Sequence, residues 1–257
     1  MPFQDLAQHA AAVRVLSDFD LPRLGFSEFF EPAYGASQYL SVYALARLLT
    51  PAFGAVVAIK LVLASALVST PYALRALLRA LDKPAILALL CLPLTFNAHV
   101  VLGFVHFVAG VPCMLFGLAL GARSCRAPSI GTKLGLAAVG VLCFYTHVVP
   151  YAMLCVGTIL LGASRSPART VERSLPLGAS ALCALWWLRV SPSGATLRQL
   201  GRGWVSAARN EDRSVLRSLE ELPVWLSDVF GARFDDLSLA VWASLMIIVL
   251  LSGWSRV

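Results

Sequence analysis

Residues 100–120 read VVLGFVHFVAGVPCMLFGLAL and contain no Asp, Glu, Lys or Arg. A straight helix needs about 20 apolar residues to cross a bilayer, so this stretch predicts a membrane-spanning helix. Gly103, Gly110 and Gly117 recur every seven residues and give one face of that helix a smooth surface suited to close packing. His106 lies three residues after Gly103 and four before Gly110, so it shares this face. We therefore expect His106 to point into a bundle of helices.

The composition of the whole chain also indicates a membrane protein. Of its 257 residues, 58% are hydrophobic and 14% are charged, and the mean hydropathy is +0.76. Soluble domains carry about a quarter charged residues, so the composition excludes a soluble domain, a disordered chain and a secreted disulfide scaffold. The six cysteines form no CxxC pair and five lie in apolar runs, which predicts packing roles. The net charge of +7 is scattered over short loops, so we expect no nucleic-acid partner.

Apolar runs separated by polar residues predict an all-α fold, a polytopic transmembrane helix bundle of about seven spans. Every backbone amide in lipid must be paired, and the runs show no alternating barrel pattern, so helices are expected. The predicted spans are 52–74, 84–98, 100–120, 133–147, 148–163, 174–190 and 237–253.

The charges orient these spans. Ten Lys and Arg residues but only two acids occupy the tail and the loops 75–83, 121–133 and 164–173, whereas the two long polar segments carry nine Arg and twelve acids. Because cytoplasmic loops are enriched in Lys and Arg, we expect a multi-pass protein of the bacterial inner membrane with the long segments outside. The expected domains are an outer-face amphipathic loop (1–51), a transmembrane bundle with two similar hairpins (52–190), an outer-face loop with amphipathic helices (191–236), and a last span with a short tail (237–257).

Both outer segments contain a predicted amphipathic helix. In residues 5–18, Leu6, Ala10 and Val13 recur at helical spacing between polar residues, and residues 212–222 repeat this pattern. We expect both helices to lie along the outer membrane surface.

A short sequence repeat places two histidines at turns between spans. Residues 96–101 read FNAHVV and residues 144–149 read FYTHVV, each on the predicted outer side. The spans that lead to these turns have 15 residues and would form about 22 Å of helix. That is shorter than the hydrocarbon thickness of about 30 Å. We therefore expect His99 and His147 to line a recess that opens outward.

The candidate binding residues are ionisable side chains in the outer half of the predicted layout. Ionisable groups at membrane depth are costly, which makes each a functional candidate. A packing role stays open for His106, and Lys60 and Arg189 either extend to the surface or bind an anionic phosphate. No HExxH or similar spacing occurs, so a divalent metal is left open and no cofactor is assigned. The substrate-binding candidates are His9, Lys60, His99, His106, His147 and Arg189.

Asp5 is the candidate catalytic residue. It lies four residues before His9 on the polar side of the predicted N-terminal helix. A carboxylate at this place can act as a general base or as a metal ligand. The alternative is a structural acid that interacts with the dipole at the start of the helix.

The acidic residue in an outer loop is followed by amphipathic helices and by the Tyr-rich stretch YGASQYLSVYALARLL at 34–49. The segment from Ala55 to Arg79 then ends in a basic turn. In this layout the sequence resembles the multi-span glycosyltransferases of the GT-C superfamily. The resemblance implies transfer of a sugar from a polyprenyl-phosphate donor in the membrane to an acceptor on the outer face, with Asp5 as the catalytic carboxylate. Membrane lipid and a polyprenyl-phosphate-linked sugar are the expected partners.

Two other functions stay open. Pro93, Pro112 and Pro150 interrupt the spans of the repeated hairpin, a pattern that favours a transporter component. In the GT-C superfamily, a membrane span precedes the acidic loop, whereas this sequence begins at Met1, close to Asp5. The second alternative is therefore a non-catalytic or truncated multi-pass membrane protein.

Overall fold

The computed structural model describes residues 4–34, 36–196, 198–199, 237, 239–245 and 247, and it contains helices and no strand within these residues. The α-helices are α1 Leu6–Ser17, α2 Phe26–Phe29, α3 Leu40–Ala80, α4 Leu92–Thr95, α5 Ala98–Leu102, α6 Val105–Arg126, α7 Ile130–Thr146, α8 Val148–Gly162, α9 Pro167–Ser174 and α10 Gly178–Val190. Short 3-10 helices lie at η1 Pro22–Leu24, η2 Ala85–Cys91 and η3 Leu175–Leu177. The predicted all-helical fold is confirmed for this part of the chain.

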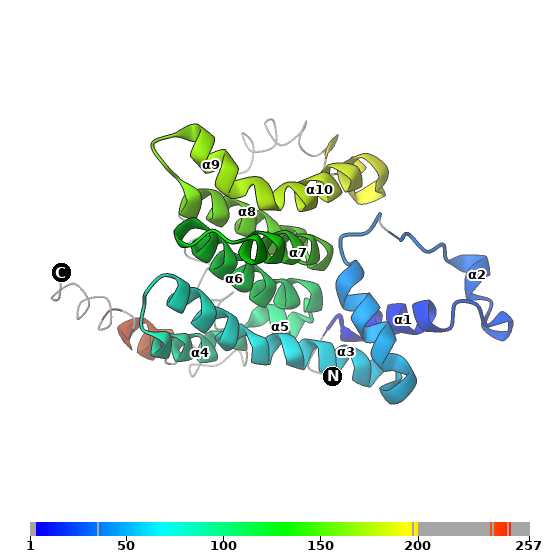
Figure 1. Ribbon diagram of the computed structural model, residues 1–257. Helices are drawn as coiled ribbons and strands as arrows, with labels where there is room; N and C mark the ends of the chain where they lie inside the picture. The colour runs from blue at the N-terminus through cyan, green and yellow to red at the C-terminus, as the bar shows by residue number, and fades with distance from the viewer. Residues whose placement is uncertain are drawn as a thin grey trace, which may run out of the picture.

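Helix α6 forms the centre of the bundle. It packs against α3, α7 and α8, and Figure 1 shows α3, α6, α7 and α10 stacked in this order. Two of the three glycines of the predicted face, Gly110 and Gly117, make the close approach to α8, whereas Gly103 lies before α6, in the turn that follows α5. A Cβ atom on Gly110 would lie 2.7 Å from Pro150 Cγ, and one on Gly117 would lie 2.7 Å from Leu154 Cδ1. His106, on the same face, is buried as expected.

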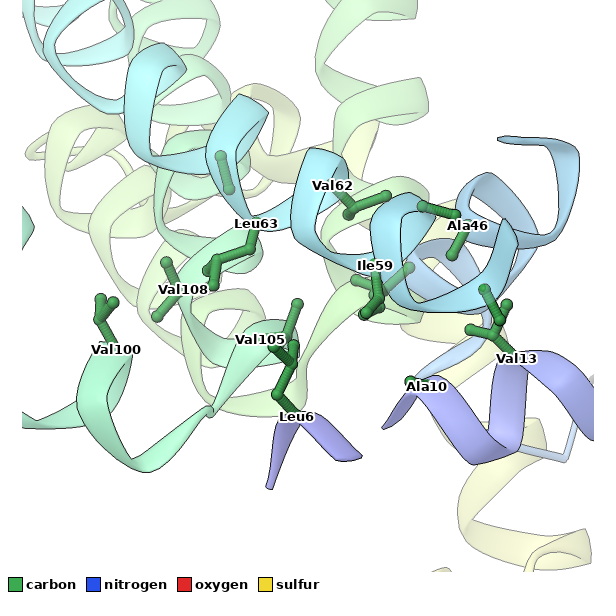
Figure 2. Close-up of a cluster of buried hydrophobic side chains, with 14 residues drawn as sticks. Leu6, Ala10, Val13, Ala46, Ile59, Val62, Leu63, Val100, Val105 and Val108 are labelled. Carbon is green, nitrogen blue, oxygen red and sulfur yellow. The ribbon is translucent and has the colours of Figure 1, made fainter. Parts of the chain in front are cut away.

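The N-terminal amphipathic helix is confirmed as α1. Its apolar residues Leu6, Ala10 and Val13 are buried in one core with Ile59 of α3 and Val105 of α6 (Figure 2). Burying a Val or Leu side chain contributes about 1.5–3 kcal/mol, so this core fixes α1 on the bundle. The second predicted amphipathic helix, residues 212–222, lies outside the described residues.

Helices α3 and α6 are long and apolar enough to cross a membrane. Shorter apolar helices cover Ala85–Thr95 and the whole of α7 and α8. The number of seven spans stays a prediction, and most of its last span, 237–253, lies outside the described residues.

Several predicted spans differ in outline from the helices that form. The span predicted at 100–120 is interrupted near its start, because α5 ends at Leu102, Gly103 has a left-handed φ of 86°, and α6 begins only at Val105. Helix α3 has 41 residues and begins well before residue 52, with a kink at Gly54, whose φ is 74°. Pro51, three residues before Gly54, has no N–H to donate and so removes one helical hydrogen bond, which favours a bend near the residue where the span was predicted to begin. The span predicted at 84–98 is not one helix but η2 followed by the four-residue α4. Pro93, near the start of α4, has no backbone N–H to donate, so a continuous helix through this span would lack one hydrogen bond.

Large apolar side chains cover the outside of the helices. Leu48, Leu134 and Leu182 are 77%, 66% and 68% exposed. By contrast, the buried residues of α3 and α6 are mostly Ala, Gly and Val. An extended apolar exterior marks a surface that contacts lipid or another protein.

Candidate functional site

The backbone at Asp5 is held against the turn between α5 and α6. The Asp5 N–H donates to the Leu102 carbonyl at 3.0 Å, and the Gln4 N–H donates to the Val101 carbonyl at 3.3 Å. Gly103 allows this turn because its φ of 86° lies in the left-handed region. A Cβ atom on Gly103 would lie 3.0 Å from the Asp5 nitrogen. The turn therefore positions Asp5 immediately before α1 begins.

His9 connects α1 with α3 and α6. Its Nδ1 atom lies 2.9 Å from the hydroxyl of Tyr43, a hydrogen-bond distance. Its ring packs edge-on against the ring of His106, with centroids 4.8 Å apart, and the Tyr43 and His106 centroids are 4.6 Å apart. Three helices thus bring His9, Tyr43 and His106 into direct contact.

Two further rings join this group to the other histidines. The ring centroid of Tyr39 lies 4.7 Å from that of His106 and 5.4 Å from that of His147. The ring of Phe107 packs against His147 at 5.5 Å and stacks on His99 at 4.7 Å. All four histidines of the chain therefore lie in one group, which we call the histidine cluster. Its members are His9, Tyr39, Tyr43, His99, His106, Phe107 and His147.

Burial disfavours protonation within the histidine cluster. It lowers the pKa of His9 below the ordinary value of 6.5, against smaller opposing effects of the Asp5 carboxylate and the Gly103 backbone. Burial also lowers the pKa of His99. The Nε2 atom of His106 is buried and has no hydrogen-bond partner among the described residues. Neutral imidazoles can accept a proton or a hydrogen bond, so the cluster can take part in proton transfer or ligand binding.

A groove of about 960 Å³ lies beside the histidine cluster, between α1 and the first part of α3. Tyr43, which bonds to His9, forms part of its wall. The groove contains Arg47, whose Nη1 donates to the Tyr34 hydroxyl at 3.4 Å. Much of the remaining lining is apolar and includes Val15, Leu16, Phe19, Leu40 and Leu48.

Two of the predicted binding residues lie apart from this site. Lys60 is exposed on α3, and Arg189 is exposed near the end of α10. Four residues of the site were not among the predicted candidates: Tyr39, Tyr43, Arg47 and Phe107. The spacing of four residues between Tyr39, Tyr43 and Arg47 places these three on one helical face, and this regular spacing is the signal that could have identified them.

The two copies of the repeat start helices in different ways. In FNAHVV, the Asn97 side chain caps α5 by accepting from the N–H groups of His99 and Val100. In FYTHVV, the histidine itself is the cap, because His147 Nδ1 accepts from the Val149 N–H at 3.1 Å. The sequence similarity therefore marks two helix starts whose capping residues stand at different positions in the motif.

Among the described residues, no group of three or more His, Cys, Asp or Glu side chains is placed to hold a metal ion. Comparisons of the chain with protein-family models, with curated proteins and with solved structures found no match. The function is therefore inferred from the site itself.

The lowered pKa of His9 predicts that acid weakens the docking of α1. Below pH 6.5, the ordinary pKa of histidine, the unfolded chain binds a proton at His9 more readily than the folded chain. The contribution of neutral, buried His9 to the free energy of unfolding is therefore complete above pH 6.5 and is lost as the pH falls below it. We expect the melting temperature of the detergent-solubilised protein to be lower at about pH 5.5 than at about pH 8. His9→Gln should show a smaller decrease, and an identical decrease in both proteins would contradict the prediction.

Proposed function

We propose that the chain is an outer-facing membrane glycosyltransferase that uses a polyprenyl-phosphate sugar donor. The observation that carries this proposal is the contact of His9 with Tyr43, a residue that lines a largely apolar groove. His9 contacts the groove wall through Tyr43, and Asp5 lies one helical turn before His9. A carboxylate and a neutral imidazole are thereby available next to a binding site for an apolar ligand.

The groove has the chemistry expected for the donor lipid. A volume of about 960 Å³ lies at the upper end of the range for ligand pockets and accommodates a long apolar chain. Arg47 carries a guanidinium group at this apolar surface, and guanidinium groups bind phosphate through paired hydrogen bonds. In the proposed complex, the polyprenyl chain occupies the groove and the phosphate lies near Arg47 and the histidine cluster.

The proposed reaction is a single displacement at the anomeric carbon of the donor sugar. A hydroxyl oxygen of the acceptor forms a bond to that carbon, and the bond between the carbon and the phosphate oxygen breaks. Polyprenyl phosphate leaves with the electron pair, and the proton of the acceptor hydroxyl moves to the Asp5 carboxylate. The positive charge of Arg47 stabilises the negative charge that develops on the leaving phosphate.

The proposed setting is a multi-pass membrane protein with residues 1–51 and 191–236 outside. The apolar exterior of the helices and the concentration of Lys and Arg in the short loops support this arrangement. In it, the shorter helices α7 and α8 cross the membrane together with α3 and α6.

Filling the groove tests whether it holds the lipid. Ala44 lines the groove on α3, so Ala44→Trp should occupy space that the polyprenyl chain needs. We expect photolabelling of the detergent-solubilised protein by a diazirine-bearing polyprenyl phosphate to fall by about tenfold, the effect of roughly 1.4 kcal/mol of lost affinity. Ala52→Trp is the matched control, because Ala52 is exposed on the same helix outside the groove lining. Equal labelling of the two variants would contradict a lipid site in the groove.

A further inference from the structure

A second pocket, of about 290 Å³, lies where the end of α6, the start of α7 and helix α9 meet. It is separate from the proposed donor site: His106 is near the start of α6 and Ser124 is near its end. Their separation of eighteen positions corresponds to about 27 Å of helix. The pocket residues are Ser124, Cys125, Pro128, Lys133, Arg169, Glu172 and Arg173.

The pocket carries an excess of positive charge. Lys133, Arg169 and Arg173 line it together with a single acid, Glu172. The ion pairs within the described part of the chain are Arg14–Asp18 and Arg126–Asp82, and neither involves a pocket residue. The three cations are therefore not neutralised by direct ion pairs with carboxylates of the described residues.

The backbone around these cations is well fixed. Arg169 and Arg173 are four residues apart in α9 and share one helical face. Arg173 Nη1 donates to the Gly162 carbonyl at 3.2 Å, which ties α9 to the end of α8. A capping box of Ser129 and Thr132 fixes the first turn of α7 and with it the position of Lys133. The positive charges are thus held in one place by three helices.

Exposed apolar side chains lie on the elements that form the pocket. Ile130 and Leu134 on α7 are 80% and 66% exposed, Val171 on α9 is 62% exposed, and Leu175 directly after α9 is 65% exposed. A cationic pocket formed by helices that carry exposed apolar side chains suits a molecule with a phosphate group and apolar chains.

We propose that this pocket binds the phosphate group of an anionic phospholipid of the membrane leaflet that faces the basic loops. Lys133, Arg169 and Arg173 hold the phosphate oxygens, and the acyl chains lie along the exposed apolar surface of these helices. The proposal is independent of the sugar transfer proposed above, since it involves none of the same residues. Free inorganic phosphate offers the same charged group without the chains, so it serves as the second ligand in the test.

The experiment measures the melting temperature of the detergent-solubilised full chain with added phosphatidylglycerol, phosphatidylcholine or inorganic phosphate. We expect phosphatidylglycerol to raise the melting temperature and phosphatidylcholine to leave it unchanged, because a ligand that binds the folded state stabilises it. Lys133→Gln with Arg169→Gln should weaken the response to phosphatidylglycerol by about tenfold in lipid concentration. The matched control is Arg75→Gln with Lys83→Gln, which removes the same charge from two exposed positions outside the pocket, one on α3 and one just after it.

A third variant separates loss of binding from loss of folding. Glu172→Gln removes the one acid of the pocket and leaves its cations, so it should respond at lower phosphatidylglycerol concentrations than the unmodified chain. A misfolded variant would not show such a gain. An equal loss in the pocket and control variants would overturn the site. A response to inorganic phosphate as large as that to phosphatidylglycerol would overturn the lipid as its ligand.

Discussion

Asp5→Asn is expected to lower sugar transfer by at least about 100-fold, because a general base commonly contributes a factor of 10² to 10⁴. Asparagine has nearly the same shape as aspartate but cannot take the proton of the acceptor hydroxyl at neutral pH. The fold should be unaffected, since Asp5 is held by its backbone N–H bond to Leu102 and its side chain makes no helix-capping hydrogen bond. The measurement is transfer of labelled sugar from polyprenyl-phosphate sugars in membranes that contain the protein.

Asp20→Asn is the matched control for this variant. Asp20 is an exposed acid in the loop that follows α1 and lies outside the groove lining, so its replacement should leave transfer unchanged. Labelling by the photoreactive polyprenyl phosphate should persist in Asp5→Asn, because the groove and Arg47 remain intact. Full transfer activity of Asp5→Asn would exclude Asp5 as the general base. Loss of labelling together with activity would instead point to a binding role.

The parts of the fold that follow from helical periodicity could be predicted from the sequence. The spacing of Leu6, Ala10 and Val13 identified α1 and its buried face, and Gly110 and Gly117 identified the close packing face of α6. Each of these patterns lies within a single helix, where residues three, four or seven apart share a face. For the same reason, the inward position of His106 could be predicted from local sequence. The third glycine of the predicted spacing, Gly103, lies in the turn before α6.

The partners of His106 could not be predicted in this way. Tyr43 contacts His9, which is 34 residues away in the sequence. Tyr39, directly before α3, contacts both His106 on α6 and His147 at the start of α8. These contacts depend on where α3 packs against α1 and α6, which is set by tertiary packing rather than by local pattern. The sequence therefore predicted that the histidines lie in the same outer half of the helix bundle, but it did not predict the tyrosines that connect them.

A charged residue within an apolar run of the sequence does not by itself mark the site, because its side chain can still be exposed. Lys60 and Arg189 stood out in the sequence because they lie within apolar runs, yet both are exposed in the structure. A long cationic side chain can reach the surface along an apolar helix, so its position in a span does not place its charge in the interior. Arg47 lies in the segment predicted as an outer loop, and the extension of α3 back to Leu40 brings it to the groove.

Gly103→Ala is expected to detach the N-terminal segment from the bundle and to abolish transfer together with it. Two costs combine at this position. A side chain at a φ of 86° costs about 1–2 kcal/mol. The new Cβ would also lie 3.0 Å from the Asp5 nitrogen and 3.1 Å from the Leu6 nitrogen, and such overpacking costs about 1–3 kcal/mol more. These neighbours are backbone atoms, so moving them away breaks the hydrogen bond from the Asp5 N–H to the Leu102 carbonyl.

Gly25→Ala separates the two costs. Gly25 has a φ of 63°, in the same left-handed region, but a Cβ there would meet only the Glu28 side chain at an ordinary distance of 3.7 Å. It therefore shares the backbone strain without the close approach. Hydrogen–deuterium exchange in the peptide that contains α1 should be faster in Gly103→Ala and unchanged in Gly25→Ala. Slow exchange and full transfer activity in Gly103→Ala would contradict the dependence of Asp5 on the α5–α6 turn. Equal acceleration in both variants would mean that backbone strain, and not contact with the N-terminal segment, explains the need for glycine at position 103.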